Sequence, residues 1–66
     1  MNELVPRYVD EKEVSKITGL ALPTLRNWRF KRIGISYSKV GRSVRYSMSD
    51  VLDYMDSRKV RTDEGN

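Results

Sequence analysis

The residues with the clearest chemistry in this sequence are basic, and they are concentrated in one segment. Residues 26–46 contain seven Arg and Lys residues and no Asp or Glu, whereas the net charge of the whole chain is only +4. The segments before and after this one each contain more acidic than basic residues. Cations gathered in this way are typical of a face that binds a polyanion. The segregation therefore favours a nucleic-acid-binding surface over a merely solvated basic one.

The side chains that the sequence lacks exclude several kinds of chemistry. It contains no Cys and no His, which excludes disulfides, thiolate nucleophiles, imidazole catalysis and zinc sites built from these residues. Asp50, Asp53 and Asp56 recur every three residues, but a helix spreads them around its axis, and we expect no metal site. The longest apolar run, Leu20 to Leu22, is far too short to span a bilayer. We expect a binding module rather than an enzyme, with no cofactor, no metal and no membrane partner.

Two helices are predicted in the first half of the chain. Asp10 followed by Glu13 forms a capping box, which predicts a helix over 11–18, and Gly19 is suited to end it. A second helix is predicted over 22–31, with a proline in its first turn, where the missing N–H has no intrahelical partner. Two short helices joined by so few residues indicate a helix-turn-helix.

A hairpin and a third helix are predicted in the second half. Residues 37–40 and 43–46 are rich in strand formers and flank a turn at Gly41-Arg42. Ser47 followed by Asp50 resembles a second capping box, which predicts a helix from Met48 onward.

The apolar residues of these elements predict a small core. Val14 and Ile17 lie one turn apart in the first helix, and Leu22, Leu25 and Trp28 share one face of the second. The expected core consists of Val14, Ile17, Leu20, Leu25, Trp28, Val40, Val44, Val51, Leu52 and Met55, with Tyr37, Tyr46 and Tyr54 in it or at its rim.

The order helix, turn, helix, hairpin, helix predicts an α+β fold that is mostly α. It is a winged helix-turn-helix with two N-terminal helices, a β-hairpin wing and a C-terminal helix. We expect this DNA-binding domain over residues 8–58, a flexible N-terminal arm over 1–7 and a disordered C-terminal tail over 59–66.

Two motifs at this spacing give the chain a resemblance to a known family. They are T-L-x-x-W at 24–28 and K-x-G-R-x-V-R-Y at 39–46, preceded by E-V-S-K-I-T-G-L at 13–20 and followed by an acid-capped helix. From Tyr8 to about Arg58 the chain resembles the excisionase and AlpA-like regulators, small DNA-binding proteins of the MerR-type winged-helix group. It departs from them at Ala21, where the family usually has a Ser or Thr cap, and at Gly34-Ile35, where many members have Gly-Pro.

The side chains expected to touch DNA follow from the outward face of the second helix and from the wing. Asn pairs with adenine and Arg with guanine in the major groove, so we expect Arg26 and Asn27 to read bases, with Pro23 and Thr24 beside them. Phe30 is expected to touch a thymine methyl group or a sugar, and its partial burial is the alternative.

The wing and the remaining cations are expected to hold the DNA beside this major-groove face. The resemblance implies that Arg42 enters the adjacent minor groove, which attracts Arg where it is narrow and A·T-rich. The residues assigned to phosphates are Arg29, Lys31, Arg32, Lys39, Ser43 and Arg45.

These expectations predict a sequence-specific double-stranded DNA-binding protein of a mobile element. The resemblance implies an excisionase, which self-associates on DNA and assists an integrase of the tyrosine recombinase class; an AlpA- or MerR-like transcriptional regulator is the alternative. Either would act in the cytoplasm, on the nucleoid, encoded by a bacterium or a phage. An adaptor whose basic face binds an acidic protein is the alternative of another class. A membrane-surface or RNA-binding peptide fits poorly, because the cations straddle a helix and a hairpin.

Overall fold

The computed structural model describes residues 7–62. The start and the end of its first helix are each fixed by a capping residue. Helix α1 covers Glu11–Thr18. Asp10 caps its start, since the Asp10 Oδ1 accepts a hydrogen bond from the Glu13 N–H at 3.0 Å. Gly19, with φ 79°, ends it by donating its N–H to the Ser15 carbonyl at 2.8 Å. Both end signals read from the sequence are confirmed.

Helix α2 covers Leu22–Lys31 and ends in a left-handed residue that is not glycine. Arg32 has φ 59° and donates its N–H to the Arg29 carbonyl, while the Ile33 N–H reaches the Trp28 carbonyl at 3.0 Å. This pair of bonds is a Schellman motif, which usually contains glycine at the left-handed position. At the other end, Ala21 provides no side-chain cap.

Three antiparallel strands form the sheet, in the order β1-β3-β2. Strands β2, Ser38–Val40, and β3, Ser43–Ser47, form the predicted hairpin, with Ser38 opposite Arg45. Strand β1, Tyr8–Val9, pairs with the other side of β3 and places Tyr8 opposite Ser47. Local sequence patterns do not indicate this pairing with the hairpin.

Helix α3, Met48–Ser57, follows β3 without a loop. Ser47 occupies the N-cap position but makes no side-chain capping bond, so the predicted second capping box is wrong. Ser47 is still paired with Tyr8 in the sheet, and the Met48 N–H donates to the Arg7 carbonyl at 2.8 Å. The segment at β1 therefore satisfies the first N–H of α3, although no side chain caps the helix.

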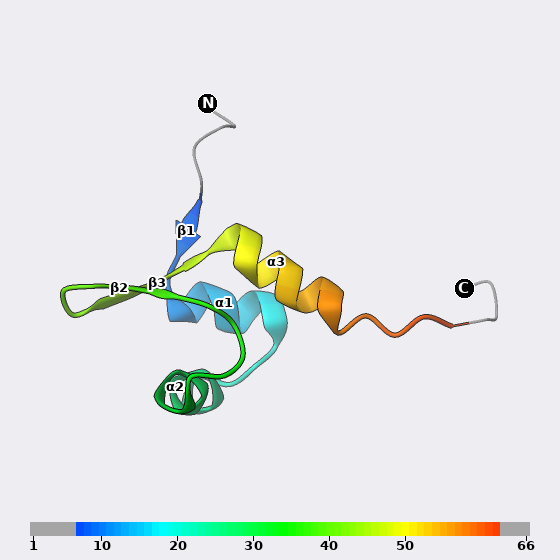
Figure 1. Cartoon of the computed structure of the whole chain (residues 1–66), viewed down its shortest axis with the longest axis horizontal. Coiled ribbons are helices and arrows are strands. Elements are labelled where there is room, and N and C mark those ends of the chain that lie inside the picture. Colours follow the sequence, from blue (N-terminus) through cyan, green and yellow to red (C-terminus); the bar gives the residue numbers. More distant parts are fainter. Residues whose placement is uncertain (1–6, 63–66) are drawn as a thin grey trace.

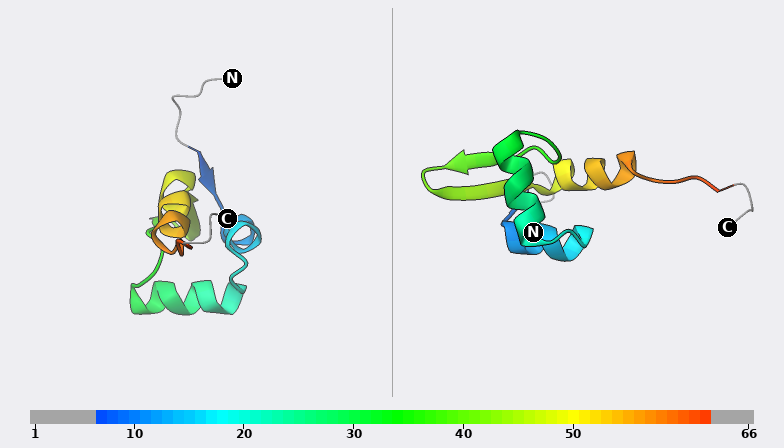
Figure 2. Two further views of the ribbon diagram at one scale, coloured as in Figure 1. Left: turned by 90° about the vertical axis from the view of Figure 1, so that its right-hand side faces the viewer. Right: turned by 90° about the horizontal axis from the view of Figure 1, so that it is seen from below.

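The helices and the hairpin lie on different sides of the molecule. Helix α2 crosses beneath α1 and α3, and its outer side is uncovered (Figures 1 and 2). The hairpin extends away from the helices in the direction opposite to α3 (Figure 1). Three helices and a small antiparallel sheet in this arrangement confirm the predicted winged helix-turn-helix class.

The core is smaller than the sequence indicated. Its buried residues are Val9, Val14, Leu25, Ile35, Tyr46 and Val51. Val40, Leu52 and Met55 are 67%, 54% and 40% exposed, so their predicted burial is wrong. Val40 lies at the end of a hairpin that extends beyond the helices, and α3 packs inward through other residues, Val51 and Tyr54.

Trp28 was predicted as a core residue, but it is only partly buried. Its ring lies 5.9 Å from that of Tyr54 on α3, measured between centroids. Its other close neighbour is Gly34, which has φ 83° and lies so near the indole that a Cβ there would overlap the Trp28 ring. Ile35, the next residue, is 5% exposed and belongs to the core. The Gly34-Ile35 pair therefore closes the chain over Trp28.

The chain ends fall only partly within the described residues. Residues 59–62 form neither helix nor strand. Most of the predicted N-terminal arm, residues 1–6, and the end of the predicted tail, residues 63–66, lie outside the described part.

Candidate nucleic-acid interface

The outer face of α2 carries the residues predicted to meet the major groove. Pro23, Arg26 and Asn27 are exposed, and Phe30 is 86% exposed. The alternative of partial burial for Phe30 is therefore wrong. Thr24 is partly buried. Because Leu25 is only 1% exposed on the opposite side of the helix, the core fixes which side of α2 faces outward.

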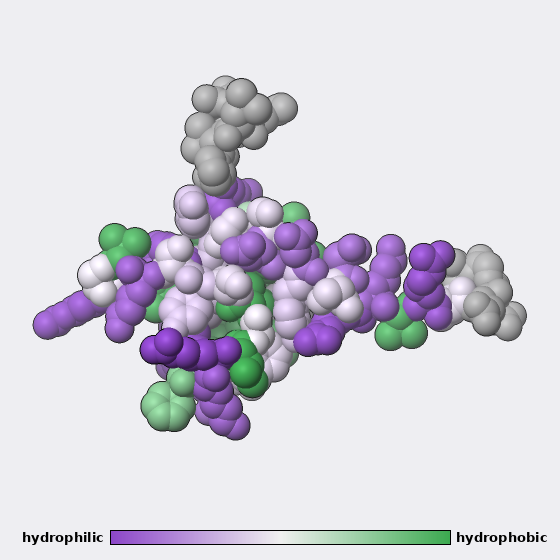
Figure 3. Space-filling model, viewed as in Figure 1, coloured by the Kyte–Doolittle hydropathy of each residue, from purple (hydrophilic) through white to green (hydrophobic). Residues whose placement is uncertain are grey.

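The hairpin carries the residues predicted to meet the minor groove and the phosphates. Gly41, with φ 62°, makes the turn, and Arg42 follows it at the exposed tip. Lys39, Ser43 and Arg45 are also exposed. Hydrophilic side chains lie at the tip of the hairpin and over part of α2, with hydrophobic patches beside them in both places (Figure 3).

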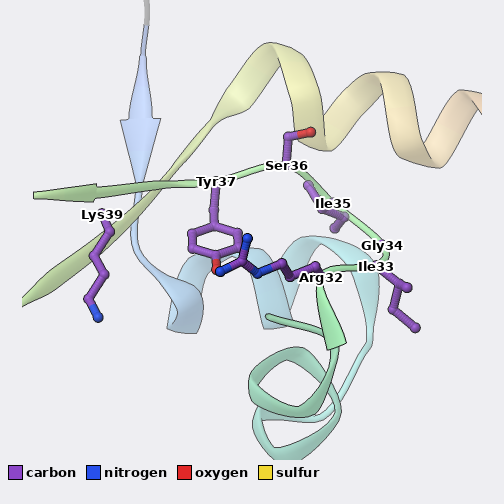
Figure 4. A pocket seen from close by; sticks show the side chains of 7 residues that line it. All are labelled: Arg32, Ile33, Gly34, Ile35, Ser36, Tyr37 and Lys39. Atoms are coloured by element: carbon purple, nitrogen blue, oxygen red, sulfur yellow. The ribbon is translucent and has the colours of Figure 1, made fainter. Parts of the chain in front are cut away.

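A hollow of about 410 Å³ joins the end of α2 to the hairpin, and its lining residues are Arg32 to Tyr37 and Lys39. Figure 4 shows the loop leaving α2 at Arg32 and rising through Gly34 and Ile35 to β2. Tyr37 and Lys39 point to the same side of the chain, as side chains two residues apart in an extended segment do. Two predicted phosphate contacts, Arg32 and Lys39, thus border one concave surface.

Glu11, at the start of α1, joins two of the predicted DNA-binding arginines. Its Oε1 accepts from the Arg26 Nε at 3.2 Å and its Oε2 accepts from the Arg26 Nη2 at 2.7 Å. The same Oε1 accepts from the Arg29 Nη2 at 3.2 Å. The hydrogen bonds from Arg26 hold the pKa of Glu11 below its usual value, against the opposing effect of burial. Sequence analysis missed this contact, because Glu11 and Arg26 are 15 residues apart and no local pattern relates them.

Arg29 is held more firmly than the other predicted phosphate contacts. Its side chain is only 18% exposed. Its Nη1 donates to the hydroxyl of the buried Tyr46 at 2.9 Å, and its guanidinium lies 5.9 Å from the ring centre of Tyr37. Arg29 therefore links α2 to α1 and to the sheet, and its contact with phosphate stays a prediction.

The start of α1, helix α2 and the wing meet in a second hollow of about 250 Å³. Its lining residues are Asp10, Glu11, Lys12, Arg29, Arg42, Val44 and Arg45. Residues separated by more than 30 positions in the sequence are thus brought onto one largely basic surface, where the two acidic residues, Asp10 and Glu11, lie at the start of α1. A convex helix beside a basic hairpin is a shape that suits neighbouring grooves of one duplex.

Within residues 7–62 no group of three His, Cys, Asp or Glu residues could hold a metal ion. Across the same residues, no helix has both the length and the apolar character needed to cross a membrane.

Comparison with known proteins identifies a family. A family model described as a helix-turn-helix domain matches residues 8–59, which is most of the chain and includes every element named above. No curated protein and no solved structure matches the chain.

Proposed function

The chain belongs to the helix-turn-helix domain family of excisionase and AlpA-like small DNA-binding proteins, and on that premise we propose that it binds double-stranded DNA sequence-specifically, with α2 in the major groove and the wing in the minor groove. One observation carries the proposal: α2 presents Arg26, Asn27 and Phe30 on an exposed face, and the hairpin presents Arg42 at its exposed tip. Arg29 of α2 and Arg42 of the wing line one shared hollow. The resemblance inferred from the sequence agrees with this family.

The base-reading residues of this proposal are Arg26 and Asn27. Both are exposed in the middle of α2, and their side chains suit guanine and adenine respectively. Phe30 lies one turn further along and offers an apolar contact to a thymine methyl group or a sugar. Lys31, Arg32, Lys39 and Arg45, together with Ser43, supply contacts to phosphates that fix the register of the protein on the duplex.

Selection from a randomised duplex library with the purified protein tests sequence specificity. We expect a reproducible motif. Closely spaced direct repeats within it would support cooperative binding by several copies, because one module of this size covers few base pairs. No enrichment, with affinity lost at physiological salt, would contradict the proposal and favour an adaptor with an acidic protein partner.

We further propose that the biological role is that of an excisionase from a mobile element, acting with an integrase of the tyrosine recombinase class. Family membership supports this role, and it equally supports an AlpA- or MerR-like regulator. The two are separated by adding the protein to a recombination reaction with an integrase encoded beside it. A shift toward excision supports the first role, whereas altered transcription from a neighbouring promoter without such a shift supports the second.

Replacing Arg42 with alanine tests the minor-groove contact of the wing. Arg42→Ala should weaken binding about five- to ten-fold on sites with A·T-rich flanks and less on G·C-rich flanks, because a narrow groove has the more negative potential. Lys39→Ala, on the same hairpin, is the matched control and should weaken binding equally on both flanks. Affinities of the two variants for both kinds of duplex are measured by fluorescence anisotropy. An equal loss for Arg42→Ala would move this residue from the groove to the backbone.

A further inference from the structure

Glu11 binds one edge of the Arg26 guanidinium and leaves a second edge open. An arginine presents five N–H donors in a flat, rigid fork. The Glu11 carboxylate takes Nε and one hydrogen of Nη2, at 3.2 and 2.7 Å. Among the described residues nothing accepts from Nη1, and the Arg26 side chain remains 56% exposed. The open edge therefore holds the outer hydrogens of Nη1 and Nη2, side by side.

This open edge has the spacing of a particular base edge. Guanine presents two acceptors, O6 and N7, in the major groove, and arginine pairs with both through two parallel N–H donors. Glu11 occupies the other edge, formed by Nε and Nη2. A free arginine can also offer this edge to a carboxylate or a phosphate.

The position of the Glu11 side chain is itself fixed by its contacts, so it can hold Arg26 in one orientation. It is the first residue of α1, and the Asp10 cap holds the start of that helix. Its Oε1 also accepts from Arg29, which is bonded to the buried Tyr46. The carboxylate is thus tied to the core through Arg29 while it holds the exposed Arg26. Like most glutamates it is ionised at neutral pH, and the hydrogen bonds from Arg26 lower its pKa further.

We propose that Glu11 is a positioning residue for specificity: it holds Arg26 with one edge aimed outward for guanine and keeps Arg26 away from phosphates. This inference rests on the proposed function, since it requires α2 to face the major groove. A single carboxylate then has two effects. It orders the side chain that reads one base, and it removes one cation from the binding of non-specific DNA.

Glu11→Gln separates these effects from a structural role, because the amide is similar in shape but uncharged. The randomised library measures the preference for guanine, and a duplex of A·T pairs alone measures binding where Arg26 has no guanine to read. We expect the preference for guanine at one position to fall about five-fold. We expect affinity for the A·T duplex to rise about three-fold, with a salt slope steeper by about 1, because Arg26 becomes free to bind a phosphate.

Two further proteins serve as controls. Glu13→Gln makes the same change of charge on the same helix, and between residues 7 and 62 both ion pairs contain Glu11 and neither contains Glu13. It should leave the preference for guanine unchanged. In an Arg26→Ala background, Glu11→Gln should have no effect on base preference, because there is no arginine left to position. Circular dichroism checks that each variant is folded at the assay temperature.

The outcomes distinguish this inference from the function on which it rests. A wild-type protein without any base preference would overturn both. A wild-type motif that Glu11→Gln leaves unchanged would overturn the role of Glu11 alone. Equal weakening on every duplex would do the same, since it would show that Glu11 supports only the fold.

Discussion

Gly34→Ala should lower the free energy of unfolding by about 3 kcal/mol, because two costs combine at this position. Gly34 has φ 83°, a conformation that costs an L-residue about 1–2 kcal/mol. A Cβ there would also overlap the Trp28 indole, and overpacking of this kind costs about 1–3 kcal/mol. A chain of this size has a total stability of about 3–10 kcal/mol, so this one methyl group should remove about a third or more of it.

Gly19→Ala is the matched control for this prediction. Gly19 has nearly the same backbone angle, φ 79°, but a Cβ there meets nothing within 4 Å. It should therefore show the backbone cost alone, about 1 kcal/mol. Urea unfolding followed by the fluorescence of Trp28, the single tryptophan of the chain, measures both variants. Equal losses for the two would mean that the contact between Gly34 and Trp28 contributes nothing to stability.

The helix ends could be predicted from the sequence because their causes are local. Asp10 caps α1 by accepting from the N–H of Glu13, three residues away, and Gly19 ends the helix by donating to the Ser15 carbonyl. A short window of sequence therefore contains all the partners. The same holds for the turn at Gly41. Ser47 shows the limit of such reasoning, because it makes no capping bond and pairs instead with Tyr8, far away in the sequence.

The core could be predicted only where a periodic element contributes to it. Val14 and Leu25 repeat with the helix, whereas Val9 lies in a two-residue strand and Ile35 in a loop, where no period exists. Val40 and Met55 have the periodicity and the chemistry of core residues, but they remain 67% and 40% exposed. A chain of this length folds with too few elements to cover every apolar face that it forms.

The candidate site also has features that the sequence predicts and features that it does not. The exposed face of α2 and the tip of the wing were predictable, because a helix or hairpin that buries one side must expose the other. The partners of Arg26 and Arg29 were not, since Glu11 reaches them across the helix-turn-helix. Charge counting treated all seven cations of the segment as equivalent. The fold makes two of them members of an ion-pair network, which changes the expected electrostatics.

The affinity for DNA should fall with a slope of about −4.5 in a plot of log K against log salt concentration, because about five cations are free to displace counterions. The exposed cations of the basic segment that Glu11 does not hold are Lys31, Arg32, Lys39, Arg42 and Arg45. Charge alone would count all seven and give a slope of about −6. At −4.5, affinity drops about 500-fold between 50 and 200 mM salt, which anisotropy titrations at several salt concentrations measure easily.

Arg32→Gly makes this slope a test of individual residues. Arg32 has φ 59° at the end of α2, where glycine is the favoured residue, so the substitution removes one cation without a backbone cost. The slope should become shallower by about 0.9, while the melting temperature stays the same or rises. A wild-type slope near −6 would show that Arg26 and Arg29 leave Glu11 for phosphates when the protein binds. A slope near zero would remove the basic segment from the binding of DNA altogether.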